Sequence, residues 1–326
     1  KGGAAIEAHE TLRILGFLKG YSELLESHLE GHHGLFDFGN AGGTRSLVEM
    51  LSELYVNMAK HDFMQMCLRI SNFIMTHPND AVHGVDTGIL SSTGPVDLLN
   101  MIHEYIGQSA KSGLDSLQAK VFVMCSQGVT AYLHDLELRV AQIRHLLMID
   151  FEDVNVGEHK DVKEKGNPNT LLFLCVLVND AELLVETFDA LEDEYSDLIE
   201  DHEYLFSGMT LEEHVSNTIH ECQSLGQLAL LQIQRVIFDD LNPMIPELMT
   251  SKFSVLETML ATMQDYFQDF EVHIRPVPFM KMLGYCYECT LKIYMAYFIE
   301  AHTDNAKRVK KGQLGGLRVA LDQEQA

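Results

Sequence analysis

The feature that most constrains this chain is a helical spacing of apolar residues that recurs along most of its length. Between residues 253 and 270 the apolar side chains follow at steps of three, three, one, three, four and three: Phe253, Leu256, Met259, Leu260, Met263, Phe267 and Phe270. This spacing places them on one face of an amphipathic α-helix. We expect the core of this helix to be formed by Leu256, Leu260, Met263 and Phe267.

The rest of the sequence also indicates an all-α fold. No alternation of period two is sustained, and the 326 residues include only seven prolines. Few helix-breaking residues in so long a chain favour long helices over many short strands. Residues 171–178 have the composition of a buried strand, but they lie within a 34-residue helical pattern at 170–203, so we assign them to a helix.

Eight or nine helical segments follow from this pattern, separated by loops that include 30–43 and 77–95. Pro95 suits a first helical turn, where its missing N–H would have no partner in any case. The apolar residues of the last helix are Leu283, Tyr287, Leu291, Tyr294 and Phe298. The segments span approximately 5–28, 44–75, 96–106, 114–149, 170–203, 211–240 and 248–270, and the last one includes residues 283–298.

One stretch is the best candidate for a boundary between domains. Residues 152–169 mix charged side chains with Gly157, Gly166 and Pro168. Breakers and charges of this kind are typical of connections between packed units. We therefore predict two helical bundles, at residues 1–160 and 166–326.

The charge of the chain limits its partners. There are 48 acidic and 23 basic residues, for a net charge of −25, and no Lys or Arg lies between Lys165 and Arg235, where 14 Asp or Glu occur. Such a surface repels nucleic acid and anionic lipid. A solvated acidic face is the simplest interpretation, and attraction to a basic partner surface is the functional one.

The six cysteines are dispersed through apolar segments, which indicates buried thiols in a reduced, cytosolic protein. Cys286 and Cys289 have CxxC spacing, but the pair lies in the middle of a helix and lacks the second pair of a zinc site, so we expect a structural role. The longest apolar run, at 171–178, has eight residues. A bilayer span needs about 20.

No catalytic, cofactor or metal site is expected. Phosphate-binding glycine loops and the nucleophile elbow are missing from the sequence. Glu30, His32 and His33 give one Glu-x-x-His spacing in a loop, whereas di-iron bundles need two copies on rigid helices. A magnesium-dependent helical enzyme remains an alternative, built on an acidic cluster. Its carboxylates are Glu192, Asp193, Glu194, Asp197, Glu200 and Asp201.

One basic run could meet the acidic lipid of the plasma membrane. It comprises Lys307, Arg308, Lys310 and Lys311. Each basic residue near such a surface contributes about 1 kcal/mol. Four charges make a weak anchor against the acidic background, so a solvated terminus is the default interpretation.

Four collinear stretches carry a resemblance to a known family. Residues 248–252 read Leu-Met-Thr-Ser-Lys before the helix that ends in Asp-Tyr-Phe-Gln-Asp-Phe, and residues 117–127 read Leu-Gln-Ala-Lys-Val-Phe-Val-Met-Cys-Ser-Gln. Residues 169–180 form an apolar run that ends in Asn179, followed by a similar helix at 182–195. Together they resemble a C-terminal segment of the exocyst complex component three family, the Sec-six subunit of the vesicle-tethering complex.

This resemblance implies an elongated rod of consecutive antiparallel helical bundles without enzyme activity. It also implies a subunit that acts in exocytosis, cytoplasmic and peripheral at sites of secretion on the plasma membrane. Its partners would be other exocyst-like subunits and SNARE or SNARE-regulating proteins. A helical adaptor of another tethering or priming complex is the nearest alternative.

Overall fold

A computed structural model describes residues 7–28, 44–76, 88–152, 168–200, 208–245, 247 and 253–302. Every regular element within these ranges is a helix, which confirms the all-α prediction. The helices are α1 (Ala8–His28), α2 (Thr44–Thr76), α3 (Gly94–Ala110), α4 (Asp115–Glu152), α5 (Pro168–Glu194), α6 (Ser196–Glu200), α7 (Leu211–Leu241), α8 (Phe253–His273) and α9 (Pro276–His302).

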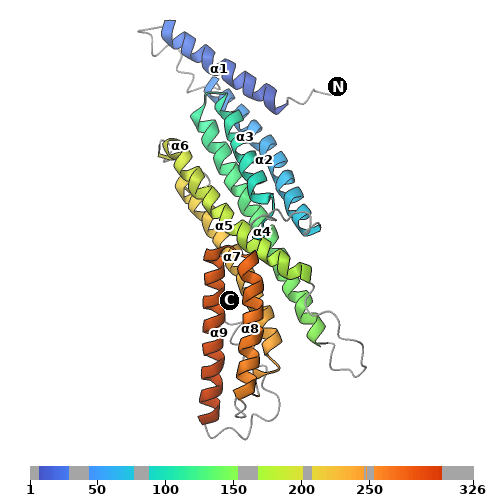
Figure 1. Cartoon of the computed structure of the whole chain (residues 1–326). Coiled ribbons are helices and arrows are strands. Elements are labelled where there is room, and N and C mark those ends of the chain that lie inside the picture. The colour runs from blue at the N-terminus through green and yellow to red at the C-terminus, as the bar shows by residue number, and fades with distance from the viewer. Residues whose placement is uncertain are drawn as a thin grey trace.

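The molecule is elongated (Figure 1). Helix α1 lies across one end, α2 to α5 form the upper half with the first half of α7, and α8 and α9 hang side by side at the other end. We call α2 to α5 with the first half of α7 the body, and α8 with α9 the arm. Helix α7 belongs to both parts, because its N-terminal half packs in the body and its C-terminal half on the arm.

The body is built on helices that are apolar on more than one side. Residues 121–126 of α4 and 173–181 of α5 are buried without interruption. A helix that is hydrophobic all round must be covered on all sides. Accordingly, α4 packs against α2 and α3 as well as α7, and α5 packs most closely against α7.

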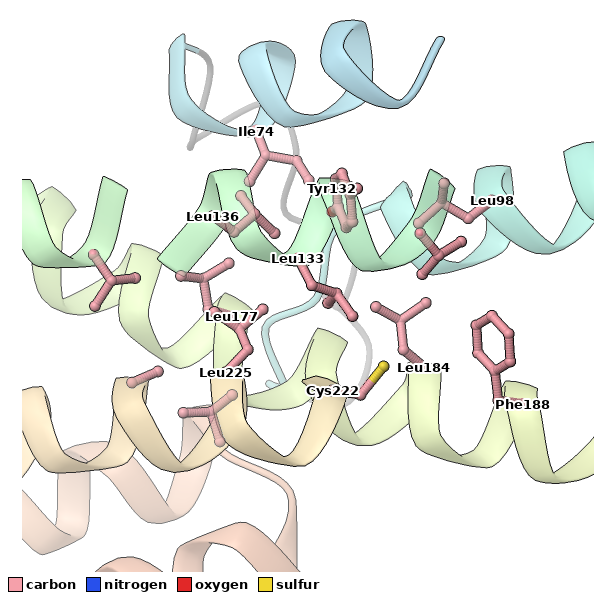
Figure 2. Close-up of a cluster of buried hydrophobic side chains, with 14 of the residues drawn as sticks. Ile74, Leu98, Tyr132, Leu133, Leu136, Leu177, Leu184, Phe188, Cys222 and Leu225 are labelled. Atoms are coloured by element: carbon pink, nitrogen blue, oxygen red, sulfur yellow. The ribbon is translucent and has the colours of Figure 1, made fainter. Parts of the chain in front are cut away.

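Side chains from five helices meet at the centre of the body (Figure 2). They are Ile74, Leu98, Tyr132, Leu133, Leu136, Leu177, Leu184, Phe188, Cys222 and Leu225. All of them have 2% exposure or less, so this cluster is a closed core. The buried apolar residues continue from it without a break into the arm, as far as Ile293.

Helix α2 can approach α4 closely because Gly128 has no side chain. A Cβ atom at Gly128 would lie 2.5 Å from two ring atoms of Phe63. The Phe63 ring itself is fully buried and meets Tyr105 edge-on, at 5.6 Å between ring centroids. A larger residue at position 128 would therefore have to move an aromatic ring that has no free space around it.

Local signals fix several helix ends as expected. Pro95 lies in the first turn of α3, as predicted. At the start of α7, the Thr210 hydroxyl accepts a hydrogen bond from the Glu213 amide at 3.1 Å, and the Thr210 amide donates to the Glu213 carboxylate at 2.7 Å. This capping box gives a partner to the backbone N–H of Thr210 and to that of Glu213, and so sets where α7 begins.

The predicted end of α3 and the predicted boundary between the two bundles differ in how they compare with the structure. Helix α3 runs on to Ala110, four residues beyond the predicted end. The division between bundles at 1–160 and 166–326 falls on residues 161–165, outside the described residues, so it stays a prediction.

The predicted core of α8 was half wrong. Met263 is buried and Phe267 packs against the core, but Leu256 and Leu260 are 41% and 56% exposed. The buried line instead runs through Met259, Met263 and Phe270. The reason is that α8 has few neighbours, so only a narrow strip of its apolar surface is covered.

Most of the apolar residues named for the last helix lie on its exposed side. In α9, Tyr287, Leu291 and Tyr294 are exposed. The side turned to the core carries Met282, Cys286, Cys289 and Ile293. Helix α9 therefore has two apolar faces, and spacing alone could not indicate which of them is covered.

Candidate interaction surface and the junction that positions it

The residues considered for metal binding do not form a site in the described part of the chain. No group of three or more His, Cys, Asp or Glu lies close enough there to hold an ion. In the acidic cluster, Asp193, Glu194 and Asp197 are exposed and Glu192 is half-buried. The Glu200 side chain, Asp201, Glu30, His32 and His33 lie outside the described residues, as does the basic run at Lys307, Arg308, Lys310 and Lys311.

All six cysteines are buried free thiols, as predicted. Cys286 and Cys289 lie on the inner side of α9. Burial raises the pKa of Cys286 to about 12 and that of Cys289 to about 11. Since the thiolate is the reactive form, these two residues act as small apolar side chains at neutral pH.

No described helix combines the length and apolar character needed to cross a bilayer.

The most specific polar arrangement is a buried junction around Asn179 of α5. Its amide nitrogen donates to the backbone carbonyls of Leu90, at 2.6 Å, and His273, at 2.8 Å. Its amide oxygen accepts from the Arg275 backbone N–H at 2.9 Å. One fully buried side chain thus joins three segments: the residues before α3, the middle of α5, and the connection between α8 and α9.

Direct contacts between the outer two segments reinforce the junction. The Leu90 backbone N–H donates to the His273 carbonyl at 3.0 Å, and His273 Nδ1 lies 3.2 Å from the Gly88 carbonyl, a contact that needs the proton on Nδ1. Gly88 has a φ of +76°, and a Cβ atom there would be 2.9 Å from Val272. Only glycine suits both the left-handed backbone and this close approach.

The neighbouring residue, Asp180, fastens the same segment by its own side chain. The Asp180 carboxylate accepts from the Ser92 backbone N–H at 2.9 Å and also from the Ser92 hydroxyl. Burial raises the pKa of Asp180 to about 7, although both bonds from Ser92 act to lower it. Among the described residues, the buried Tyr132 hydroxyl has no hydrogen-bond partner. Burial and, as a smaller cause, the charge of Asp180 raise the pKa of Tyr132 well above its usual value.

Two ion pairs hold the arm to α5 beside this junction. Arg275 lies 2.9 Å from Glu186, and Lys281 lies 3.7 Å from Glu182. Further along, the Gln234 side chain on α7 donates to the Tyr285 carbonyl at 2.9 Å, and the Tyr266 hydroxyl donates to Asp240 at 2.6 Å. The direction of the arm relative to the body is therefore fixed by polar contacts at its root.

Packing between the arm and the body is incomplete. A pocket of about 290 Å³ lies between α5, α7 and α9. Its lining includes Val178, Glu182, Gly226, Leu230, Lys281 and Tyr285. The arm is thus seated on polar contacts as well as on the apolar core that continues into it.

The outer side of the arm is the candidate interaction surface. Its large apolar side chains are from 41% to 65% exposed: Leu256, Leu260, Met280, Tyr287, Leu291, Tyr294 and Met295. Two of them, Leu256 and Leu260, were expected from the sequence to lie in the core. At the opposite end of the molecule, α1 has a comparable outer face with Ile14, Phe17, Tyr21 and Leu24.

The junction residues were mostly missed in the sequence. Asn179 was singled out only through the family resemblance, and Asp180 and Ser92 were not singled out at all. The available signal was an adjacent pair of polar residues closing an apolar run of eight. Polar side chains in the middle of a buried helix are hydrogen-bonded in nearly all proteins, so the pair implied a partner elsewhere in the chain.

Comparison with known proteins agrees with the fold. The crystal structure of the C-terminal domain of the exocyst subunit Sec6p matches with a TM-score of 0.61 at 16% sequence identity, over 76% of this chain. The chain spans 62% of that solved domain. At this level of identity the match shows the fold.

The sequence as a whole gives the stronger result. It matches the family described as "Exocyst complex component Sec6" over residues 4–315 of 326. This range includes the body, the junction and the arm, and it confirms the resemblance drawn from the four collinear stretches. The chain therefore belongs to the family of the exocyst complex component Sec6.

Proposed function

We propose that this chain is a non-enzymatic subunit of an exocyst-like vesicle-tethering complex, in which it acts as a helical scaffold in exocytosis. The observation that carries the proposal is the match to the Sec6 family over residues 4–315. The elongated packing of long helices supports it, because a rigid rod can hold two bound partners at a fixed separation (Figure 1).

The partners that we propose are other subunits of the complex and SNARE or SNARE-regulating proteins. The two outer faces, on α1 and on the arm, support this part of the proposal. Exposed apolar patches rimmed by polar residues mark protein contacts in many soluble proteins, and helices often dock in apolar grooves. The site of action would be the cytoplasmic side of the plasma membrane, where secretory vesicles arrive.

A contact with membrane lipid is an auxiliary part of the proposal. It would be made by Lys307, Arg308, Lys310 and Lys311, which together could contribute about 4 kcal/mol next to anionic lipid. The net charge of −25 opposes the approach. Flotation with phosphatidylserine vesicles tests this contact, and replacing the four residues with alanine should abolish any binding observed.

The main test is affinity purification of the chain from its native cytosol, followed by mass spectrometry of the proteins that accompany it. We expect several large helical subunits together with SNARE or SNARE-regulating proteins. The control is an unrelated helical protein of similar size and acidic charge, purified with the same tag. A chain that emerges without companions beyond those of the control would contradict the proposal.

A further inference from the structure

The outer face of α9 has the pattern of a coiled-coil seam. Met280, Gly284, Tyr287, Leu291 and Tyr294 follow at steps of four, three, four and three, and all are exposed. This is the spacing with which one helix packs along another. The face lies on the far side of α9 from the core, since Leu291 is turned about 180° from Met282 at 3.6 residues per turn.

The seam covers two heptads. It extends over 15 residues, from Met280 to Tyr294, a rise of about 21 Å at 1.5 Å per step. Leu256 and Leu260 of α8 lie at the same level of the arm, because they precede the α8–α9 connection by about as many residues as Leu291 and Tyr294 follow it. The exposed apolar residues thus gather towards the free end of the arm.

The charges around the seam indicate the chemistry of its partner. Residues 253–302 include six Asp or Glu and three Lys or Arg. Two of the three cations, Arg275 and Lys281, are paired with carboxylates of α5 at the root of the arm. Five of the acidic residues are exposed: Glu257, Asp265, Asp269, Glu271 and Glu288.

We propose that the outer face of α9 is a docking surface for a basic amphipathic helix of a partner protein, with apolar residues at alternating three- and four-residue steps and Lys or Arg beside them. The excess of acidic over basic residues on the arm attracts such flanks through its overall field. The same charges repel a second copy of this chain, which also has a net charge of −25, and an anionic membrane. The inference deepens the proposed scaffolding function and rests on it.

A synthetic helix can test the surface on the 326-residue chain. The probe is a fluorescent peptide of about 22 residues, slightly more than six turns, with Leu at the heptad a and d positions and Lys at e and g. Binding is followed by fluorescence anisotropy at physiological salt. A second peptide has Glu in place of every Lys, and a third has the composition of the first in scrambled order.

The variants separate the seam from the general acidity of the protein. Tyr287→Glu with Leu291→Glu should weaken binding of the Lys peptide at least tenfold, and Tyr287→Ser with Leu291→Ser should have a similar effect without new charge. The matched control is Leu138→Glu, which replaces an apolar residue of the body that is 51% exposed. We expect it to bind as the unchanged chain does, and circular dichroism should show the same melting midpoint for all.

Three results would overturn the inference. One is equal affinity in the seam variants and Leu138→Glu, which would mean attraction to the overall charge alone. Another is equal binding of the Glu or scrambled peptide. The third is a dimer in analytical ultracentrifugation that the serine variant dissociates, which would assign the face to a second copy. Failure of the scaffolding proposal is seen separately, because the co-purification experiment does not involve the peptide.

Discussion

The body and the arm differ in how much of the apolar surface of their helices is covered by neighbouring helices. In the body, α4 and α5 each have a stretch that is buried on every side, at 121–126 and 173–181, whereas in the arm α8 and α9 are each buried along a single strip. Both parts have helices of similar apolar content, so composition does not set the difference. The number of neighbouring helices does, and an apolar side chain stabilises the fold only where a neighbour covers it.

The largest expected contrast comes from truncating a leucine in each part. Leu133→Ala in the body removes a fully buried side chain from the cluster in Figure 2 and should lower the free energy of unfolding by about 2–5 kcal/mol. Leu260→Ala in the arm should change it by less than about 0.5 kcal/mol, since the side chain is 56% exposed. Urea denaturation measures both. Equal losses would show that the arm is covered as fully as the body.

The junction should matter nearly as much as the body core. Asn179→Ala removes three buried hydrogen bonds and leaves the Leu90 carbonyl and Arg275 N–H without this partner. At about 1–3 kcal/mol for each of these two groups, we expect a loss of about 2–6 kcal/mol.

Hydrogen exchange should show where that loss acts. Amides of α9 should exchange faster in Asn179→Ala, while those of α4 keep most of their protection. The control is Asn242→Ala, an exposed asparagine that follows α7. Uniform loss of protection in both parts would mean that arm and body unfold together, and the comparison drawn above would fail.

A smaller effect tests how tightly the body is closed. Gly128→Ala should destabilise the protein by about 1–3 kcal/mol, because the new methyl group collides with the Phe63 ring. Gly107→Ala, where a Cβ would meet nothing within 4 Å, should instead stabilise α3 by about 0.5–1 kcal/mol. Thermal melts of the two variants should shift in opposite directions, and a neutral Gly128→Ala would indicate a looser crossing of α2 and α4.

The last prediction concerns the dependence of stability on pH. The pKa of Asp180, about 7 in the folded protein against 3.8 ordinarily, means that the folded state keeps a proton which the unfolded state releases. Stability therefore falls as pH rises from about 4 to 7, by up to about 1.4 kcal/mol per pH unit for one proton, and changes no further above that range.

Asp180→Asn should remove this contribution, because an amide does not ionise. The unfolding free energy of the variant minus that of the unchanged chain should rise from pH 5.5 to 7 and then level off, because only the unchanged chain loses stability over this range. Asp193→Asn, at an exposed position of the same helix, is the control over the same series. A difference that does not vary with pH, or that is the same for both variants, would contradict the assignment.

The sequence predicted the helices well because the signals that form a helix lie between residues close together in the chain. Apolar spacing, Pro95 and the Thr210 and Glu213 pair all act within a few residues. In α4, Leu117, Val121 and Met124 follow the helical spacing and are buried, since α2, α3 and α7 cover this helix from several sides.

The arm and the junction could not be predicted from local patterns. Leu256 and Leu260 fit the helical spacing as well as Met259 does, and only the position of α7 decides between them. Asn179 bonds to groups 89 to 96 residues away. Nothing near Asn179 in the sequence indicates those partners. The local pattern shows only a polar residue at the end of an apolar run.

The bond between Leu90 and His273 also has a consequence for how the protein is made. The two residues are 183 positions apart, so the ribosome must add all the residues between them before the Leu90 backbone N–H finds its partner. Helices α2 to α7 can pair as they emerge, since each of them contacts helices close in sequence. We expect Leu90 and Ser92 to dock first on Asn179 and Asp180 of α5, and the Leu90 N–H to remain unpaired until the α8–α9 connection has left the exit tunnel.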